Sequence, residues 1–165
     1  MTIRGPEVAD SLADIGNIIG GVLVETEEAW KRMDWKPWLG NVAVAAIERY
    51  ETGYYEAETD PLGAAWQQLA AATIRKKGHD TILVDSGRMK ASLTGRTSDS
   101  IIDVVQEGMN AGLTRGTSVE YAGFHQTGTR TIPQRAHVGL DEAKVDALTE
   151  AAADEAVRLL MELMA

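Results

Sequence analysis

Apolar side chains recur at three- and four-residue steps near both ends of this chain, and that spacing predicts amphipathic helices there. The N-terminal stripe predicts one helix over residues 7–33 and a second over residues 38–50, because Lys36-Pro37 interrupts the pattern. The C-terminal stripe predicts a closing helix over residues 141–165. Since most of an amphipathic helix's stability comes from covering its apolar face, these helices need a layer to pack against.

The middle of the chain has the pattern of strands, in which apolar or β-branched residues alternate with polar ones. Four segments are expected to be extended: residues 88–94, 100–105, 109–113 and 136–140. Short helices are expected over residues 67–77 and 121–126, and an acidic loop over residues 51–61. This order indicates an α+β fold, in which an antiparallel sheet of about four strands packs with an N-terminal helical region and a C-terminal helix.

The length of 165 residues fits a single domain over 1–165. Within it we expect N-terminal helices over 1–52, a core with the sheet over 60–140 and the C-terminal helix over 141–165. An apolar fraction of 44% supports a core without disulfides, and the sequence has no Cys. The apolar run Ile15–Val24 contains three glycines and is far shorter than the roughly 20 apolar residues of a membrane span. We therefore expect no signal peptide, no membrane anchor and synthesis in the cytoplasm.

The net charge of −9 is unevenly distributed. Residues 1–60 carry −7, residues 61–135 carry +3 and residues 136–165 carry −5. An acidic chain repels phosphate, so only the middle third could contact nucleic acid, and its one basic run, Arg75-Lys76-Lys77, is expected to be a solvated helix end. A small cytoplasmic nucleic-acid-binding module that uses this run with Arg88 and Lys90 stays an alternative, which a salt-sensitive gel shift would detect.

No constellation of residues in the sequence predicts an active site. The three histidines, His79, His125 and His137, have no metal-ligand spacing, and without Cys no thiolate site can form. Adjacent carboxylates occur on helices rich in other charges, where their pKa values would not be driven apart as acid–base catalysis requires. We expect no catalytic, cofactor or metal site. A small hydrolase with His125 as its base is the remaining enzymatic alternative.

Four stretches, in order, resemble the phage virion morphogenesis or tail-completion family. The first has Pro61, Gly63, Trp66 and Leu69 in a Pro-x-Gly-x-x-Trp-x-x-Leu run that ends in Lys76-Lys77-Gly78. The others are similar to family motifs as follows: Ile-Leu-Val-Asp-Ser-Gly over residues 82–87, Tyr-Ala-Gly-Phe-His-Gln-Thr-Gly over residues 121–128, and Ile-Pro-Gln-Arg over residues 132–135. Ala136-His137 departs from the Pro-Phe that the family prefers at this point.

The resemblance implies a non-enzymatic structural subunit of the phage neck or tail-completion ring, which joins tail to head around the DNA channel. It implies a homo-oligomeric ring of six or twelve copies in the virion, synthesised in the bacterial host. Its partners would be other neck, adaptor and tail-tube proteins, and DNA would pass without sequence-specific binding. A tail terminator or a head-side adaptor of the same neck is equally compatible with the sequence.

The segment from Tyr121 to Arg135 is the candidate contact surface, because aromatic and Arg side chains in loops are favoured at interfaces. We expect its base to be anchored in the domain by Tyr121 and Phe124. The side chains expected to face a neighbouring subunit are His125, Gln126, Arg130 and Arg135.

Overall fold

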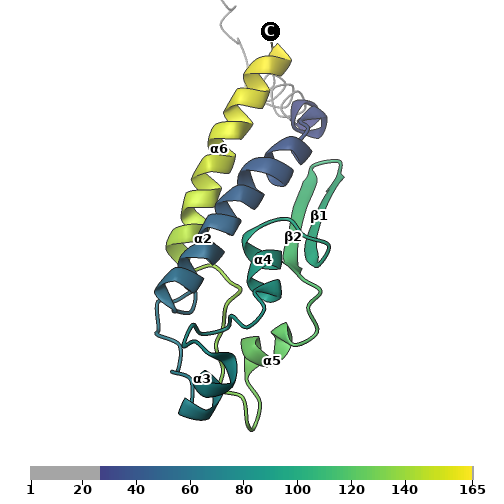
Figure 1. Cartoon of the computed structure of the whole chain (residues 1–165). Coiled ribbons are helices and arrows are strands. Elements are labelled where there is room, and N and C mark those ends of the chain that lie inside the picture. Colours follow the sequence, from purple (N-terminus) through teal and green to yellow (C-terminus); the bar gives the residue numbers. More distant parts are fainter. Residues whose placement is uncertain (1–26, 165) are drawn as a thin grey trace, which may run out of the picture.

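The computed structural model describes residues 27–164 (Figure 1). The helix predicted over residues 7–33 therefore lies outside the described residues, except that residues 27–32 are helical. The remaining elements are η1 (Trp38–Ala43), α2 (Val44–Ala57), α3 (Ala71–Lys77), α4 (Arg88–Thr94), β1 (Ser100–Glu107), β2 (Asn110–Thr117), α5 (Ala122–Thr127) and α6 (Glu142–Met164). In Figure 1, α2 and α6 run side by side, the β1–β2 hairpin lies beside α2, and α3 and α5 lie at the end remote from the C-terminus.

The helix that follows Pro37 is longer than predicted. It begins as the wider π-helical turns of η1, continues without a break into α2, and ends at Glu58, which has φ 51°. Part of the acidic segment 51–61 is therefore helical and not a loop. The reason is tertiary, because Glu51, Tyr54 and Tyr55 are all buried and their spacing places them on one face of the helix.

The interruption before this helix is confirmed and lies at residues 33–35. Its backbone polar groups are bonded by one side chain of β1, that of Gln106. The Gln106 amide accepts from Trp35 N at 2.9 Å and donates to Met33 O at 2.6 Å. The hairpin therefore supplies the hydrogen bonds that the helix break leaves open.

Only two of the four predicted strands are strands among the described residues. β1 pairs antiparallel with β2, and Glu107 opposite Asn110 leaves Gly108 and Met109 as the turn. The prediction of a strand over residues 136–140 is wrong, because these residues form no strand and join no sheet. Side chains from the core occupy their carbonyls instead: Trp66 Nε1 donates to Ala136 O, Gln126 Nε2 to Val138 O and the Tyr54 hydroxyl to Gly139 O.

The prediction of a strand over residues 88–94 is also wrong, because this segment is the helix α4. Its buried residues are Met89, Ser92 and Leu93, at helical and not alternating positions, and Ala91 is exposed. Over only seven residues, the helical and the strand spacing of apolar side chains resemble each other, so tertiary packing decides which structure forms.

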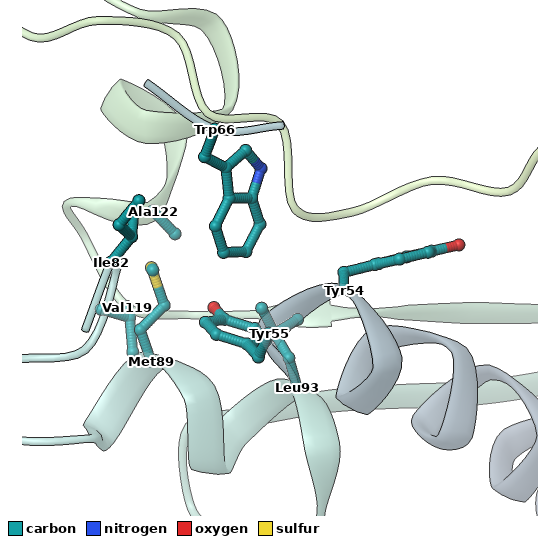
Figure 2. Close-up of a cluster of buried hydrophobic side chains, with 8 residues drawn as sticks. All are labelled: Tyr54, Tyr55, Trp66, Ile82, Met89, Leu93, Val119 and Ala122. Carbon is teal, nitrogen blue, oxygen red and sulfur yellow. The ribbon is translucent and has the colours of Figure 1, made fainter. Parts of the chain in front are cut away.

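Two clusters form the core. The first joins α2, α4, α5 and the segments around them, with Tyr55 and Trp66 edge to face at 5.6 Å (Figure 2). The second, around Trp35 and Trp38, is covered by one face of α6, whose contributing residues are Ala151, Ala152, Ala156, Leu159 and Leu160. The predicted closing helix is thus confirmed, and it packs against the residues around the break between the helices.

A buried guanidinium connects α2, α4 and the hairpin. Arg115 of β2 donates to Ser92 O at 3.3 Å and to Leu93 O, which are C-terminal carbonyls of α4. The same guanidinium lies 3.3 Å from Glu48 Oε1 and 3.6 Å from Glu51 Oε2 of α2. Burial raises the pKa of Glu51 to about 7, although the Arg115 charge opposes this shift.

We predict that Glu51→Gln removes a pH dependence of stability. The folded-state pKa of Glu51 lies above its unfolded value of 4.5, so its contribution to stability is complete below pH 4.5 and is lost as pH rises through about 7. At pH 8 the variant should exceed the wild type by up to about 3 kcal/mol, relative to their difference at pH 4.5. Urea unfolding of both proteins across this range measures the effect. Glu56→Gln, on the exposed side of α2, is the matched control, and a pH-independent Glu51→Gln difference would contradict the prediction.

Candidate functional site

The family-like stretches of the sequence converge on one groove at the end of the molecule where α3 and α5 lie (Figure 1). The groove has a volume of about 760 Å³. One wall is the segment that leads into α3, the second is the turn that leads into α4, and the third is α5 with the loop that follows it. Four separate stretches, within residues 67–77, 83–89, 121–125 and 131–135, thus form a single surface.

Arg135 lies at the base of the groove and is only 6% exposed, which corrects the expectation that it faces a neighbouring subunit. Its Nε donates to Gln67 O at 2.8 Å and its Nη2 to Gln68 O at 3.4 Å, while its backbone N donates to His125 O. Gln67 and Gln68 precede α3 and lie outside any helix or strand, so their carbonyls are free to accept. Arg135 therefore holds the loop after α5 against the segment before α3.

No carboxylate of the described residues forms an ion pair with Arg135. Burial lowers the pKa of its guanidinium, and no neighbouring charge offsets this effect. The base of the groove therefore carries a buried positive charge that is compensated by carbonyl dipoles alone. Such a charge favours an anionic group in the groove.

Gln126 is half-buried and fastens the extended segment that follows the loop. Its Oε1 accepts from His137 N at 2.9 Å and from Val138 N at 3.1 Å. The loop turns back at Gly128, where φ is 73° and an added Cβ would lie 2.9 Å from Gln134 N. No other residue fits there without a shift of the backbone. Gln126, expected to face outward, has its amide engaged inside the domain.

His125 lines the groove and is half-buried, with its ring edge to face with Tyr121 at 6.4 Å between centroids. Its Nδ1 is buried without a hydrogen-bond partner. Burial, together with the positive charges of His137 and Arg135, lowers the pKa of His125, so the ring is neutral at neutral pH. No side-chain hydrogen bond joins His125 to a hydroxyl or carboxylate in the part of the chain that the structure describes, so a nucleophile–base pair is not formed there.

The exposed side chains of α5, of Tyr121 before it and of the loop after it are called the rim below, because these segments contribute lining residues to the groove. Arg130 is exposed at the loop, as predicted, but Phe124 is 55% exposed and Tyr121 38% exposed, so neither is a core anchor. Val119 and Ala122 anchor this region instead, since both are buried in the core. Their three-residue spacing is the helical signal that could have identified them from the sequence.

The basic run at the end of α3 is a solvated helix end, as expected. Arg75 and Lys76 are exposed, and Lys77 Nζ donates to Thr81 O at 2.7 Å beyond the helix. Two other cations of the nucleic-acid alternative are engaged elsewhere. Arg88 forms a bidentate pair with Asp99 at 2.7 Å, and Lys90 Nζ lies 5.7 Å from the centroid of the Tyr55 ring. A continuous free basic surface is therefore not formed.

Three further findings concern the described residues 27–164. They contain no group of three or more His, Asp or Glu residues placed to hold a metal ion. None of their helices is long and apolar enough to cross a membrane. The groove described above is lined by both apolar and polar side chains, which suits recognition of another molecule.

These features define a small α+β protein with a groove formed by the segment before α3, the turn before α4, and α5 with the loop that follows it. The chain belongs to the phage virion morphogenesis family, whose model matches residues 26–159. The resemblance seen in the four motifs is thereby confirmed, over a longer span that includes most of α6. No curated protein and no solved structure matches the chain.

We predict that Arg135→Ala and Arg130→Ala have very different effects on stability. Arg135→Ala removes a buried guanidinium and its hydrogen bonds to the carbonyls of Gln67 and Gln68, and should lower the free energy of unfolding by about 2–4 kcal/mol. Arg130→Ala removes an exposed side chain and should change it by less than about 0.5 kcal/mol. Thermal and urea unfolding of the two variants measure this difference. Equal effects would mean that Arg135 does not hold the loop.

Chelator treatment should leave the thermal unfolding transition unchanged. The sequence has no Cys, and the described residues form no cluster of ligands, so no metal should contribute to folding. Calorimetry with and without EDTA, after purification without added metal, tests this. A marked fall in the transition temperature would contradict it.

Proposed function

We propose that the protein is a non-enzymatic structural subunit of the phage neck or tail-completion ring, joining tail to head around the DNA channel. The observation that carries this proposal is the family match over residues 26–159, whose motif residues converge on one groove. In this proposal the virion is the site of action, and the partners are further copies of the chain with neck, adaptor and tail-tube proteins. Six or twelve copies form the ring.

The construction of the groove supports a binding role. Gln126 and Arg135 fix the backbone of the loop from inside, so its rim is already ordered before a partner arrives. Preorganisation raises affinity because less conformational entropy is lost on binding. The rim then presents Phe124, Tyr121 and Arg130, residue types that are enriched where interfaces are strongest.

The charge of the chain supports the passage of DNA without specific binding. A net charge of −9 repels phosphate, and the cations of the nucleic-acid alternative are largely paired or engaged. Tail terminator and head-side adaptor are the neighbouring roles within the same neck. Particle images with the protein labelled would separate them by its position.

We predict that replacing the rim impairs assembly but not folding. Phe124→Ala with Arg130→Ala should keep the circular dichroism and thermal stability of the wild type, because both side chains are exposed. In phage that depend on this variant, joined infectious particles should decrease, and separate heads and tails should accumulate. Plaque titre and electron microscopy of lysates measure both effects.

The matched control is Val105→Ala with Arg49→Ala, an exposed apolar residue and an exposed Arg outside the groove. The control should assemble particles at the wild-type yield. Normal yield for the rim variant would contradict its role at the contact. Absence of the protein from purified particles would contradict the proposed function itself.

A further inference from the structure

Cationic side chains outnumber carboxylates in the lining of the groove, which contains Lys77, Arg88 and Arg135 against Asp85. Its base carries the Arg135 guanidinium, which has no carboxylate partner among the described residues, and the unpartnered Nδ1 of His125. Apolar side chains, including Leu83 and Ile132, contribute to its walls. Two exposed cations that form no ion pair with described residues, Lys76 of α3 and Arg130 of the loop, are sequence neighbours of the lining residues Lys77 and Thr131, and they are called the cations at the mouth below. A complementary ligand would be acidic at one end and apolar at the other.

A surface of this kind exists on α6 of the same chain. Glu150, Asp154, Val157 and Met161 follow one another at steps of four, three and four residues, so they lie along one stripe of the helix. Val157 is 59% exposed and Met161 67% exposed, which is unusual for apolar side chains in a covered helix. Below, these four residues are called the α6 stripe.

The carboxylates of the α6 stripe are available to a partner. Glu150 and Asp154 are exposed and form no ion pair with any described residue, whereas their neighbour Glu155 is bound by Arg158 at 2.6 Å. The charges of the two regions are also opposite, since residues 61–135 carry +3 and residues 136–165 carry −5. Attraction between such surfaces both favours and orients association.

We propose that the groove of one copy binds the α6 stripe of a second copy. The acidic end of the stripe, Glu150 and Asp154, pairs with the cations at the mouth and base of the groove. Val157 and Met161 pack against its apolar walls. This inference rests on the proposed ring and deepens it, by naming the two surfaces through which neighbouring copies meet.

The two surfaces cannot meet within one molecule. Figure 1 shows the second half of α6 at the C-terminal end of the molecule, whereas α3 and α5, which flank the groove, lie at the opposite end. A contact between different surfaces of identical chains is heterologous. When two copies are joined in this way, one still has a free groove and the other still has a free α6 stripe. Such a contact continues from copy to copy until it closes, as a ring requires.

Charge reversal on each surface tests the proposal with the full chain. The groove variant is Lys76→Glu with Arg130→Glu, and the stripe variant is Glu150→Lys with Asp154→Lys. All four side chains are exposed and unbonded among the described residues, so circular dichroism and thermal unfolding should match the wild type. Sedimentation velocity up to millimolar concentration should show self-association of the wild type and its loss in each variant.

Mixing the two variants gives the decisive result. The groove variant keeps an intact stripe, the stripe variant keeps an intact groove, and the two altered surfaces also carry opposite charges. An equimolar mixture should therefore form mixed dimers and larger alternating complexes, although neither variant associates alone. The dimers should weaken as salt is raised, because screening reduces the attraction between exposed charges. A wild type that remains monomeric at all concentrations, or a mixture that forms no dimer, overturns the proposal.

Failure of this contact is distinguishable from failure of the proposed function. If the wild-type chain is found in purified particles but the mixed variants form no dimer, copies meet through other surfaces and the structural role stands. If the mixture dimerises but the chain is absent from particles, the contact stands and the neck role fails.

Discussion

The position of Arg115 is the constraint on which the rest of the structure depends. Its guanidinium is almost fully buried, where it bonds the last carbonyls of α4 and faces Glu48 and Glu51 of α2. A short hydrogen bond of 2.6 Å between Ser92 and Thr117 adds a second tie between α4 and β2. Buried charges of this kind give little net stability but penalise every arrangement that leaves them unpaired. The hairpin, α4 and α2 can therefore pack against one another in only one relative position.

This arrangement has a consequence for the groove, because α4 begins at its wall. Arg88 and Met89, the first residues of α4, line the groove, while the other end of the helix is held by Arg115. The bidentate pair of Arg88 with Asp99 fixes the wall from the side of the hairpin. The ion cluster around Arg115 and the groove proposed for binding thus lie at opposite ends of one short, rigid helix, α4.

Long sequence patterns determine local structure in this chain, whereas short ones do not. The closing helix and the interruption near Pro37 were predicted correctly, because long apolar stripes and a proline restrict the backbone locally. The helical turn α5 was also predicted. Residues 88–94 were assigned to a strand, since seven residues fit both periodicities until burial selects one. Residues 136–140 form no strand, because side chains from distant segments bind their carbonyls.

For the site, the sequence alone determined which stretches belong together, since the motifs that indicated the phage virion morphogenesis family are those that surround the groove. Arg130, predicted to face a neighbouring subunit, is exposed, and its role at a contact stays a prediction. Only the tertiary structure decided that Arg135 and Gln126 point inward while Phe124 points outward. The physical reason is that a polar side chain is buried wherever distant backbone groups complete its hydrogen bonds, and those partners, 11 or more residues away, cannot be identified from local sequence.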